Sequence, residues 1–405
     1  MRIAAGASGV LVGIYMADLA NHGLKVDAAL VGVLGAVSFV AELVGAVPMG
    51  LASDALAPRA LMISGSLLAA LATQLFGMSG HASIFFLSRA LEGLGAAAIT
   101  PSLLAHLTDV TASDYTLRAR VMSYFEISLL AGLGVGGLVG SQLWRVFNAR
   151  AFSVVALVYV LCAGLLFVGA IGSRGYGSKE AILGFYRALS EPSLRRLAPV
   201  WLCVNTVVGL WLGPTLFFLM THRSQDHQFL AGLYANKPDR VGWLLLGYSL
   251  VFGAGVTGWS IVLPRISAQR ALRIALIAML GACLGLFLFN HSSGETPVAR
   301  WLIGALTALC IMVESGFTPA ALALLAGAVG AQAGRGAAMG IYSVLLSIGA
   351  IAGSLLAAAL GQKFAVDGLI YGTLAMALVA LIFVHWLTNT NSSEAEQGWQ
   401  NKSTI

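Results

Sequence analysis

Charged side chains are scarce in this chain: only 10% of its 405 residues are Asp, Glu, Lys or Arg. Soluble domains carry roughly 25% charged residues, which excludes an ordinary globular protein. Cysteines are also few, and all four lie inside apolar stretches, which argues against a disulfide framework or a metal site. The net charge of +6 is spread between apolar stretches rather than gathered with aromatic residues, so no nucleic-acid partner is expected.

Long apolar stretches are abundant instead. Hydrophobic residues make up 58% of the sequence, and the mean hydropathy is +0.87. About 20 consecutive apolar residues suffice to cross a bilayer as a helix. The pattern predicts an all-α membrane protein with twelve transmembrane helices, and no strand pattern is present. The predicted spans are 3–21, 29–52, 60–80, 83–107, 119–144, 151–172, 197–221, 240–263, 271–290, 299–328, 335–361 and 366–388.

Two segments far apart in the chain follow the same pattern. Residues 85–140 place a proline in one apolar helix and a row of glycines in the next, and residues 318–357 repeat this order. Parallel half-repeats are one of the known transporter architectures, so we expect two pseudo-symmetric halves of six helices. The matching residues are Thr100-Pro101 with Thr318-Pro319, Arg118 with Arg335, Met122 with Met339, Gly132 with Gly349, and Gly136 with Gly353.

The predicted halves are residues 1–172 and 197–388. A polar, basic cytoplasmic linker, 173–196, joins them and contains a candidate amphipathic helix on the membrane surface. Residues 389–405 are rich in Asn, Ser and Glu, which predicts a disordered cytoplasmic tail. The connections on the side of the two termini carry more Lys and Arg than those on the opposite side. This bias predicts a multi-pass protein of the cell (inner) membrane with both termini in the cytoplasm.

The connection between the second and third predicted spans contains Gly50, Asp54 and Arg59. A glycine, an aspartate four residues later and a following basic residue resemble the signature loop of the major facilitator superfamily. The resemblance implies the fold of that family, transport by alternating access and a cytoplasmic gate that also includes Arg118 and Arg120. A solvated, positive loop without a gating role is the alternative. The residues that depart from the motif are Ala55, Ala57 and Pro58.

Two further motifs follow in the order that the family has them. Arg89 and the glycines after it resemble the family's fourth-helix motif. A row of glycines in the fifth predicted span resembles its antiporter motif, although Gly137 replaces a proline and Ser141 a glycine. Such a row permits close helix packing, and the resemblance implies that it also seals the closed state. The glycines of the row are Gly132, Gly136 and Gly140.

Ionisable residues inside the predicted spans are candidates for function, because each costs roughly 2.5–3.5 kcal/mol to insert. Glu92 and Glu314 lie near the middle of their spans and are the best candidates for proton or cation sites, with Asp18 third. Arg89 shares a helix face with Glu92, so it tunes this carboxylate, binds an anionic group, or only forms a structural ion pair. Asp18 could instead lie unused in the headgroup region. A structural role is favoured for Glu42 and Glu126. The residues concerned are Asp18, Glu42, Arg89, Glu92, Glu126 and Glu314.

The seventh predicted span offers polar and aromatic groups to a substrate. Asn205 could donate a hydrogen bond, and Trp211 could stack on an aromatic or cationic compound. The alternative for the tryptophans is interfacial anchoring and packing, which we favour for Trp201 near the end of the span.

The sequence contains no arrangement of residues typical of an enzyme, and no cofactor or metal is expected. Proton-coupled export of a small apolar or cationic organic compound is the first hypothesis, with the substrate, protons and the lipid bilayer as partners of a monomer. Uptake or exchange of a polar solute, such as a sugar or an organic acid, is the second. Movement of a lipid or lysolipid, or a non-transporting membrane sensor, are further alternatives. The buried carboxylates and the antiporter-like glycines favour the first.

Overall fold

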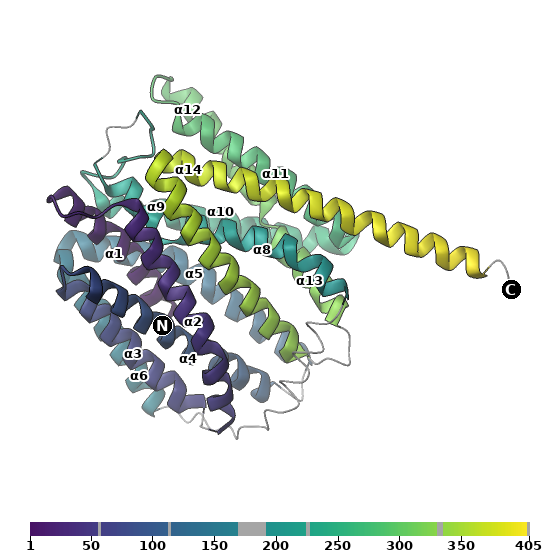
Figure 1. Cartoon of the computed structure of the whole chain (residues 1–405), viewed down its shortest axis with the longest axis horizontal. Helices are drawn as coiled ribbons and strands as arrows, with labels where there is room; N and C mark the ends of the chain where they lie inside the picture. The colour runs from purple at the N-terminus through teal and green to yellow at the C-terminus, as the bar shows by residue number, and fades with distance from the viewer. Residues whose placement is uncertain (56–57, 112–114, 169–191, 224–226, 330–334, 403–405) are drawn as a thin grey trace.

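The computed structural model describes residues 1–55, 58–111, 115–168, 192–223, 227–329 and 335–402, and every regular element within these ranges is a helix (Figure 1). The first half contains α1 (Arg2–Asn21), α2 (Ala28–Ala55), α3 (Pro58–Met78), α4 (Ala82–Val110), α5 (Tyr115–Phe147), η1 (Asn148–Arg150) and α6 (Ala151–Val168). The second half contains α8 (Pro192–Leu212), α9 (Pro214–Thr221), η2 (Pro238–Arg240), α10 (Val241–Val262), η3 (Leu263–Arg265), α11 (Ala268–Asn290), α12 (Pro297–Glu314), α13 (Phe317–Val329) and α14 (Arg335–Lys402). The amphipathic helix predicted within the linker lies outside the described residues.

Ten stretches of the described residues are long and apolar enough to cross a membrane. Two of them contain two crossings each. The stretch Ile127–Val168 contains most of α5, then η1 and the whole of α6. The stretch Val344–Trp386 reverses direction at Ala365, which has φ 49° and ψ −130°. The twelve membrane-spanning helices predicted from the sequence are therefore confirmed.

Two spans that the sequence predicts as single units are each split into two helices. Gly213 has an extended backbone (φ −75°, ψ 164°), and Pro214 then begins α9 at the position where a missing N–H is harmless. The other break follows Glu314 at Ser315-Gly316, before α13 begins. Both breaks contain a glycine, which is a poor helix former, and both are followed by a proline.

The last helix is longer than the predicted span 366–388. α14 continues to Lys402 and projects from the bundle (Figure 1). The physical reason lies in how helices grow. An existing helix can add residues without the cost of nucleation, and this stretch contains no proline to stop it.

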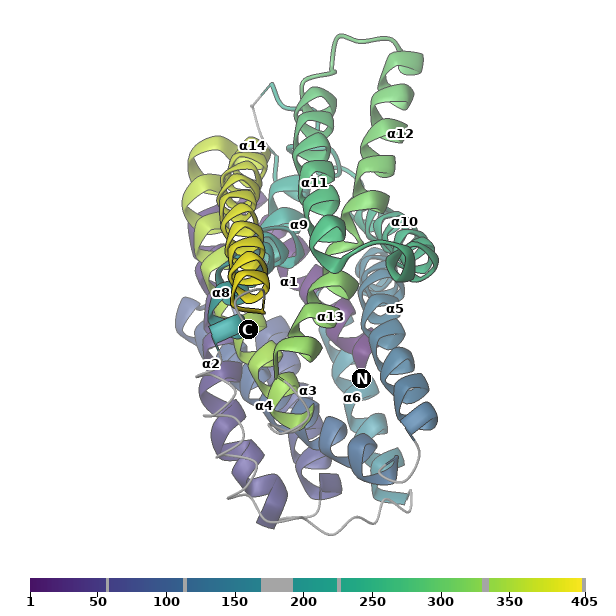
Figure 2. The ribbon, with the colours of Figure 1, turned by 90° about the vertical axis from the view of Figure 1, so that its right-hand side faces the viewer.

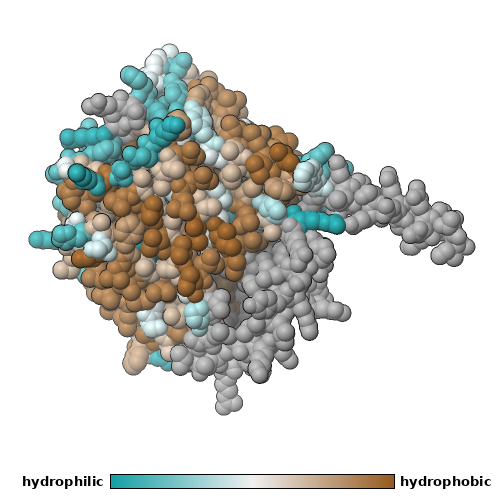
Figure 3. All heavy atoms as spheres, viewed as in Figure 1, coloured by the Kyte–Doolittle hydropathy of each residue, from teal (hydrophilic) through white to brown (hydrophobic). Residues whose placement is uncertain are grey.

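A broad belt of apolar side chains covers the middle of the molecule, and hydrophilic side chains gather at one end (Figure 3). Large apolar side chains are strongly exposed, with Val168 at 85% and Trp301 at 80%. Such exposure would be unfavourable in water but is expected where lipid chains cover the surface. The belt therefore marks the depth of the protein within a bilayer.

Helix α1 lies inside the bundle. All residues from 10 to 17 are buried, so the helix is covered on every side. Tyr15 lies at its centre, with its hydroxyl donating to the Ser79 carbonyl at 2.9 Å. The Tyr15 ring contacts the rings of Phe76 and Phe152 at centroid distances of 6.2 and 5.6 Å. This aromatic cluster ties α1 to α3 and α6.

The two halves contact each other through α2 with α14, α5 with α10, and α1 with α9. Figure 2 shows α5 and α10 side by side. Glycines allow these close approaches. A Cβ at Gly32 would lie 2.7 Å from the Ala358 Cα, and one at Gly134 would lie 2.8 Å from the Ser249 Cβ. These contacts lie toward the end of the bundle that carries residues 22–27, 148–150 and 222–240, called the outer end below because the basic-residue bias predicts that it faces away from the cytoplasm.

Among the residues that the structure describes, four hydrogen bonds cross between the halves at the outer end, and each joins a side chain to a backbone group. The Asn21 side chain makes two of them, donating to the Thr221 carbonyl at 3.3 Å and accepting from the Arg223 N–H at 3.0 Å. Gln142 Nε2 donates to the Asp239 carbonyl at 2.9 Å. The Ala29 N–H donates to Gln362 Oε1 at 3.3 Å. Together these bonds form what we call the outer seam.

Candidate functional site

A buried ion pair joins three helices of the first half. The Arg89 guanidinium on α4 donates to the Glu92 carboxylate three residues away, and 7% and 17% of the two side chains are exposed. Ser8 on α1 donates to the other Glu92 oxygen at 3.0 Å. Arg89 Nε donates to the Leu34 carbonyl on α2 at 3.3 Å. The pair is thus held by hydrogen bonds to α1 and α2 as well as by its own contact.

Close packing of α2 against α4 creates this site. Gly93 follows Glu92 directly, and a Cβ there would lie 2.9 Å from the Ala41 Cβ. One turn further along α2, a Cβ at Gly45 would lie 2.9 Å from the Ala97 Cβ. Because glycine has no side chain, the α2 backbone comes within reach of Arg89. The Leu34 carbonyl can then accept a hydrogen bond from the guanidinium, which would be costly to bury without an acceptor.

Further polar groups lie close to this pair. Glu42 on α2 interacts electrostatically with Arg2 and with Glu92, and Tyr159 on α6 interacts with both members of the pair. The Arg2 guanidinium also lies 5.1 Å from the centre of the Phe125 ring. Among the described residues, two acids and two arginines therefore lie close together in the first half, and the formal charges of these four balance.

The second candidate carboxylate lies at a helix break. Glu314 is the last residue of α12, and Tyr248 of α10 and Cys283 of α11 interact with it electrostatically. The sequence repeat pairs Thr100 with Thr318. In this alignment Glu314 lies four residues, or one helical turn, after the residue that corresponds to Glu92. The two halves thus place their carboxylates at similar but not identical depths.

The break itself is stabilised from α10. Trp259 Nε1 donates to the Val313 carbonyl at 2.8 Å, which satisfies an acceptor near the end of α12. Gly316 provides the space for the indole, because a Cβ at this position would collide with the Trp259 ring. Broken helices are tolerated at membrane depth only when neighbouring groups satisfy the freed backbone in this way.

The two residues expected to contact substrate lie at helix contacts. Asn205 is 6% exposed and lies against Gly349, and its Nδ2 has no hydrogen-bond partner among the described residues. Trp211 Nε1 donates to Thr373 Oγ1 on α14 at 2.7 Å. Trp211 therefore already uses its polar group, whereas the Asn205 amide remains able to donate.

Asp18 lies apart from these groups. Its carboxylate is 3.5 Å from His22 Nδ1, and 43% of its side chain is exposed. Ser8, which bonds Glu92, is ten residues earlier on α1, or about 15 Å along the axis. This position suits the alternative that Asp18 lies near the outer headgroups.

The glycine row lies where α1 crosses α5. A Cβ at Gly132 would lie 2.7 Å from the Arg2 Cβ, one at Gly136 would lie 2.5 Å from the Ile3 carbonyl oxygen, and one at Gly140 would lie 2.7 Å from the Ala7 carbonyl oxygen. The second half repeats the arrangement. A Cβ at Gly353 would lie 2.7 Å from the Gly209 Cα, so α14 approaches α8 as α5 approaches α1.

Of the predicted cytoplasmic gate, Arg59 is the residue whose side chain the structure describes. The Arg59 guanidinium lies 5.6 Å from the centre of the Phe167 ring on α6. The other residues fall within α2 and α5, but their side chains, like that of Glu126, lie outside the described residues. These gate residues are Gly50, Asp54, Arg118 and Arg120.

Sequence reasoning missed a polar cluster at the outer end. Asp367, at the bend of α14, is 6% exposed and accepts from Asn290 Nδ2 at 2.8 Å. Its other oxygen lies 2.9 Å from His291 Nε2. Gln228 accepts from Asn290 at 3.2 Å and from the Asp367 N–H at 3.2 Å. The sequence signal that could have revealed this cluster is Asp367 itself, an aspartate directly after the bend between two spans.

A membrane-spanning bundle of two like halves, with ionisable groups buried in its interior, is an architecture found among secondary membrane transporters. The chain matches the family model described as Major Facilitator Superfamily over residues 1–307 and again over 230–404. It therefore belongs to the Major Facilitator Superfamily.

Three similarities are informative. The chain is 28% identical over 141 residues to "Multidrug resistance protein 2" of Bacillus subtilis, covering 33% of this chain and 35% of that protein. It is 24% identical over 275 residues to "Gentisate transporter" of Corynebacterium glutamicum, covering 62% and 57%. These matches span from about a third to somewhat over half of the relatives' lengths. A solved bacterial homologue of the human lysosomal transporter Spinster, inward-facing and unoccupied, has a TM-score of 0.71 at 14% identity over 96% of both chains, which supports the fold.

Proposed function

We propose that the protein exports a small apolar or cationic organic compound in exchange for protons, by alternating access. The observation that carries the proposal is the buried Arg89–Glu92 pair with its bonds to α1 and α2. A proton on Glu92 would remove the charge that balances Arg89. The bonds that join α4 to α1 and α2 would then change, which links protonation to the arrangement of helices. The similarity to Multidrug resistance protein 2 supports this class of substrate.

Glu314 is the second group in the proposal. It lies at the break between α12 and α13, so a change in its charge acts where the span can bend. Broken helices line substrate and ion sites in many secondary transporters. The proposal therefore assigns one proton-responsive carboxylate to each half.

Transport of an organic acid is the second candidate. The similarity to a gentisate transporter favours it, and so does Arg89. When Glu92 is protonated, Arg89 becomes a buried cation without a counter-ion, which a carboxylate of the substrate could neutralise. Under this alternative the proton and the acid would move in the same direction.

Purified protein in proteoliposomes, with a pH-sensitive dye inside, tests the proposal. The panel contains lipophilic cations, neutral drugs, sugars, organic acids and lysolipids. We expect lipophilic cations to drive proton movement, and Glu314→Gln to reduce it by about tenfold or more, because glutamine cannot carry a proton. The matched control is Glu295→Gln, since Glu295 is an exposed residue of the connection before α12.

Three outcomes are decisive. Proton movement driven by organic acids instead of cations would select the second candidate. Substrate flux without proton movement, unchanged in Glu314→Gln, would reject coupling. Equal losses in Glu314→Gln and Glu295→Gln would show that the assay does not report on the buried site.

Alternating access also requires the outer seam to open. Replacing Asn21 by Ala removes two of the four cross-half bonds and should destabilise the closed seam by about 1 kcal/mol. The population with an open outer end should therefore rise about fivefold. Ser354 can report this opening. It is 1% exposed, and its Oγ would lie 3.3 Å from a Cβ at Gly35, across the contact of α14 with α2.

The measurement is the rate at which a membrane-impermeant maleimide labels Ser354→Cys in a variant without the four native cysteines. We expect about fivefold faster labelling when Asn21→Ala is added. His22→Ala is the control, because His22 contacts Asp18 within its own half. Unchanged labelling in Asn21→Ala would mean that these bonds do not hold the seam closed.

A further inference from the structure

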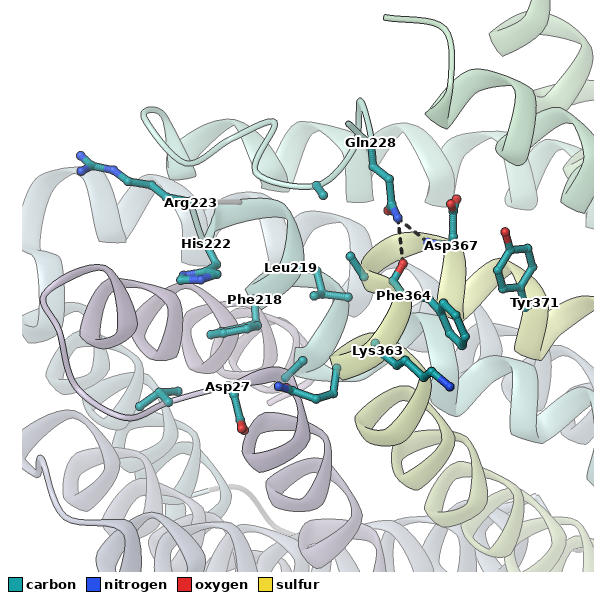
Figure 4. Close-up of a pocket in the computed structure, with 16 residues that line it drawn as sticks. Asp27, Phe218, Leu219, His222, Arg223, Gln228, Lys363, Phe364, Asp367 and Tyr371 are labelled. Atoms are coloured by element: carbon teal, nitrogen blue, oxygen red, sulfur yellow. Dashed lines mark hydrogen bonds between the residues drawn. The ribbon is translucent and has the colours of Figure 1, made fainter. Parts of the chain in front are cut away.

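Two hollows formed by the described residues open at the outer end, and both lie where the two halves meet. Two acidic and two basic residues line the first, of about 510 Å³, and the Arg223 side chain points away from it (Figure 4). The formal charges of this lining cancel, so it favours neither sign of charge in a ligand. The four charged residues are Asp27, Asp367, Arg223 and Lys363.

The second hollow, called the seam groove below, has a volume of about 680 Å³ and an unequal charge. Two arginines and one aspartate line it, which leaves a formal charge of +1. Both arginines are exposed, and neither forms an ion pair with a described carboxylate. The lining is therefore positive, and its cations are open to a ligand. The six lining residues are Gln142, Arg145, Tyr234, Asp239, Arg240 and Trp243.

The seam groove lies at the outer end of the contact between α5 and α10. Ser141 of α5 contacts α10, because a Cβ at Gly242 would collide with its hydroxyl. Arg145 lies one turn beyond Ser141 on the same face of α5. Arg240 lies two residues before Gly242 and interacts electrostatically with Tyr234. The two arginines thus face the groove from opposite halves of the protein.

Apolar surface begins directly below these arginines. Val146 follows Arg145, Trp243 follows Arg240 by three residues, and both apolar side chains are strongly exposed. One turn further along α10, Gly247 has nothing within 4 Å of its would-be Cβ, so the surface of the helix is open there. Tryptophan and arginine at the border of an apolar belt are typical of the head-group level of a bilayer. The groove therefore lies at the level of the outer head groups.

We propose that the seam groove binds the phosphate of an anionic phospholipid of the outer leaflet, and that the bound lipid holds the outer end closed. Guanidinium groups bind phosphate through paired hydrogen bonds, and a lipid with one net negative charge matches the +1 of the lining. The acyl chains would lie on the open surface of α10 near Gly247. A soluble phosphate ester offers the same head-group chemistry without the chains.

The effect on conformation follows from where the arginines come from. Arg145 belongs to the first half and Arg240 to the second, so opening the outer end would separate them. The seam bond from Gln142 Nε2 to the Asp239 carbonyl, at 2.9 Å, belongs to the same lining and would break in that movement. A ligand that contacts both arginines binds the closed form better, and it therefore shifts the equilibrium toward that form.

A fluorophore on Gly247→Cys, in the variant without the native cysteines, measures which lipids lie beside the groove. The protein is placed in phosphatidylcholine nanodiscs that contain a small share of brominated phosphatidylglycerol or brominated phosphatidylcholine, which quench the fluorophore on contact. We expect phosphatidylglycerol to be enriched there about threefold, the size of one exposed charge pair. Leu157→Cys is the matched position, because it is exposed and is the seventh residue of α6, as Gly247 is of α10. It should show no such enrichment.

Arg145→Gln and Arg240→Gln should each reduce the enrichment at Gly247, and the double variant should abolish it. Lys25→Gln/Arg150→Gln is the control, since it removes two exposed cations at the same end but outside the groove. Equal enrichment at Gly247 and at the matched position would overturn the proposal, as would equal losses in the two double variants. Glycerol phosphate at millimolar concentration distinguishes the source. Unchanged quenching supports the lipid, whereas reversal of the enrichment assigns the groove to soluble phosphate esters and overturns the lipid.

The labelling rate of Ser354→Cys tests the conformational part. Phosphatidylglycerol nanodiscs should slow the labelling about threefold relative to phosphatidylcholine nanodiscs, and this difference should disappear in Arg145→Gln/Arg240→Gln. Faster labelling, or slowing that persists in this double variant, would overturn that part. Neither readout requires transport, so the result does not depend on the proposed substrate or on proton coupling.

Discussion

Replacing Glu92 by Gln should both destabilise the protein and abolish its proton coupling. The substitution leaves Arg89, which is 7% exposed at its side chain, as a buried cation without a counter-ion. Removing one partner of such a pair costs about 3–5 kcal/mol. Arg89→Leu should have an effect of similar size, because among the described residues the Ser8 hydroxyl is then the remaining hydrogen-bond partner of the Glu92 carboxylate. The measurement is the apparent Tm in detergent together with proton movement in proteoliposomes.

The double variant Arg89→Leu/Glu92→Leu separates the two roles. It leaves no unpaired charge, so its stability should return to within about 1–2 kcal/mol of the native protein. Its proton coupling should still be absent. A double variant that is stable and still couples protons to transport would reduce the pair to a structural element, and Glu314 would then be the remaining candidate.

Gly136→Val should disrupt the packing of α1 against α5. A Cβ at this position would lie 2.5 Å from the Ile3 carbonyl oxygen and 3.1 Å from the Ala7 nitrogen. Both are backbone atoms, which cannot turn away as a side chain can. Two further methyl groups would push the helices apart, and overpacking of this kind costs about 3 kcal/mol or more. We expect a lower Tm and a loss of transport.

Gly164→Val is the matched control. Gly164 is a helical glycine of α6 with nothing within 4 Å of its would-be Cβ, so the same substitution should change stability by only about 0.5 kcal/mol. If Gly136→Val and Gly164→Val lowered the Tm equally, close packing would not be the reason for the glycine row. Gly353→Val offers a further comparison, because Gly353 lies at the equivalent crossing of the second half.

The helices themselves were predictable because length and hydropathy alone decide whether a segment can cross a bilayer. The expected span 3–21 is α1 (Arg2–Asn21), and the expected span 271–290 is α11 (Ala268–Asn290). The sequence repeat also predicted a repeat in the structure, since Gly136 and Gly353 lie at equivalent helix crossings of the two halves. These features are local, or depend on a pattern that the chain contains twice.

The surroundings of the candidate site were less predictable, for a physical reason. A membrane helix that is apolar on most of its faces gives little indication of which face meets which neighbour. The contact of Arg89 with Glu92 follows from their spacing, but the bond from Ser8 and the acceptor at Leu34 depend on the rotation of two other helices. The break after Glu314 likewise depends on Trp259, which is distant in sequence and satisfies the freed carbonyl.

The outer seam has a consequence for how sequence change would be tolerated there. In all four of its bonds, a side chain of one half meets a main-chain atom of the other, namely Thr221 O, Arg223 N, Asp239 O and Ala29 N. Substituting the side chains at these positions leaves every bond intact, apart from proline at the two donors. Inserting or deleting a single residue next to them shifts the main chain and breaks the bonds. The four main-chain positions should therefore accept varied side chains but not varied lengths, whereas their side-chain partners Asn21, Gln142 and Gln362 must be kept.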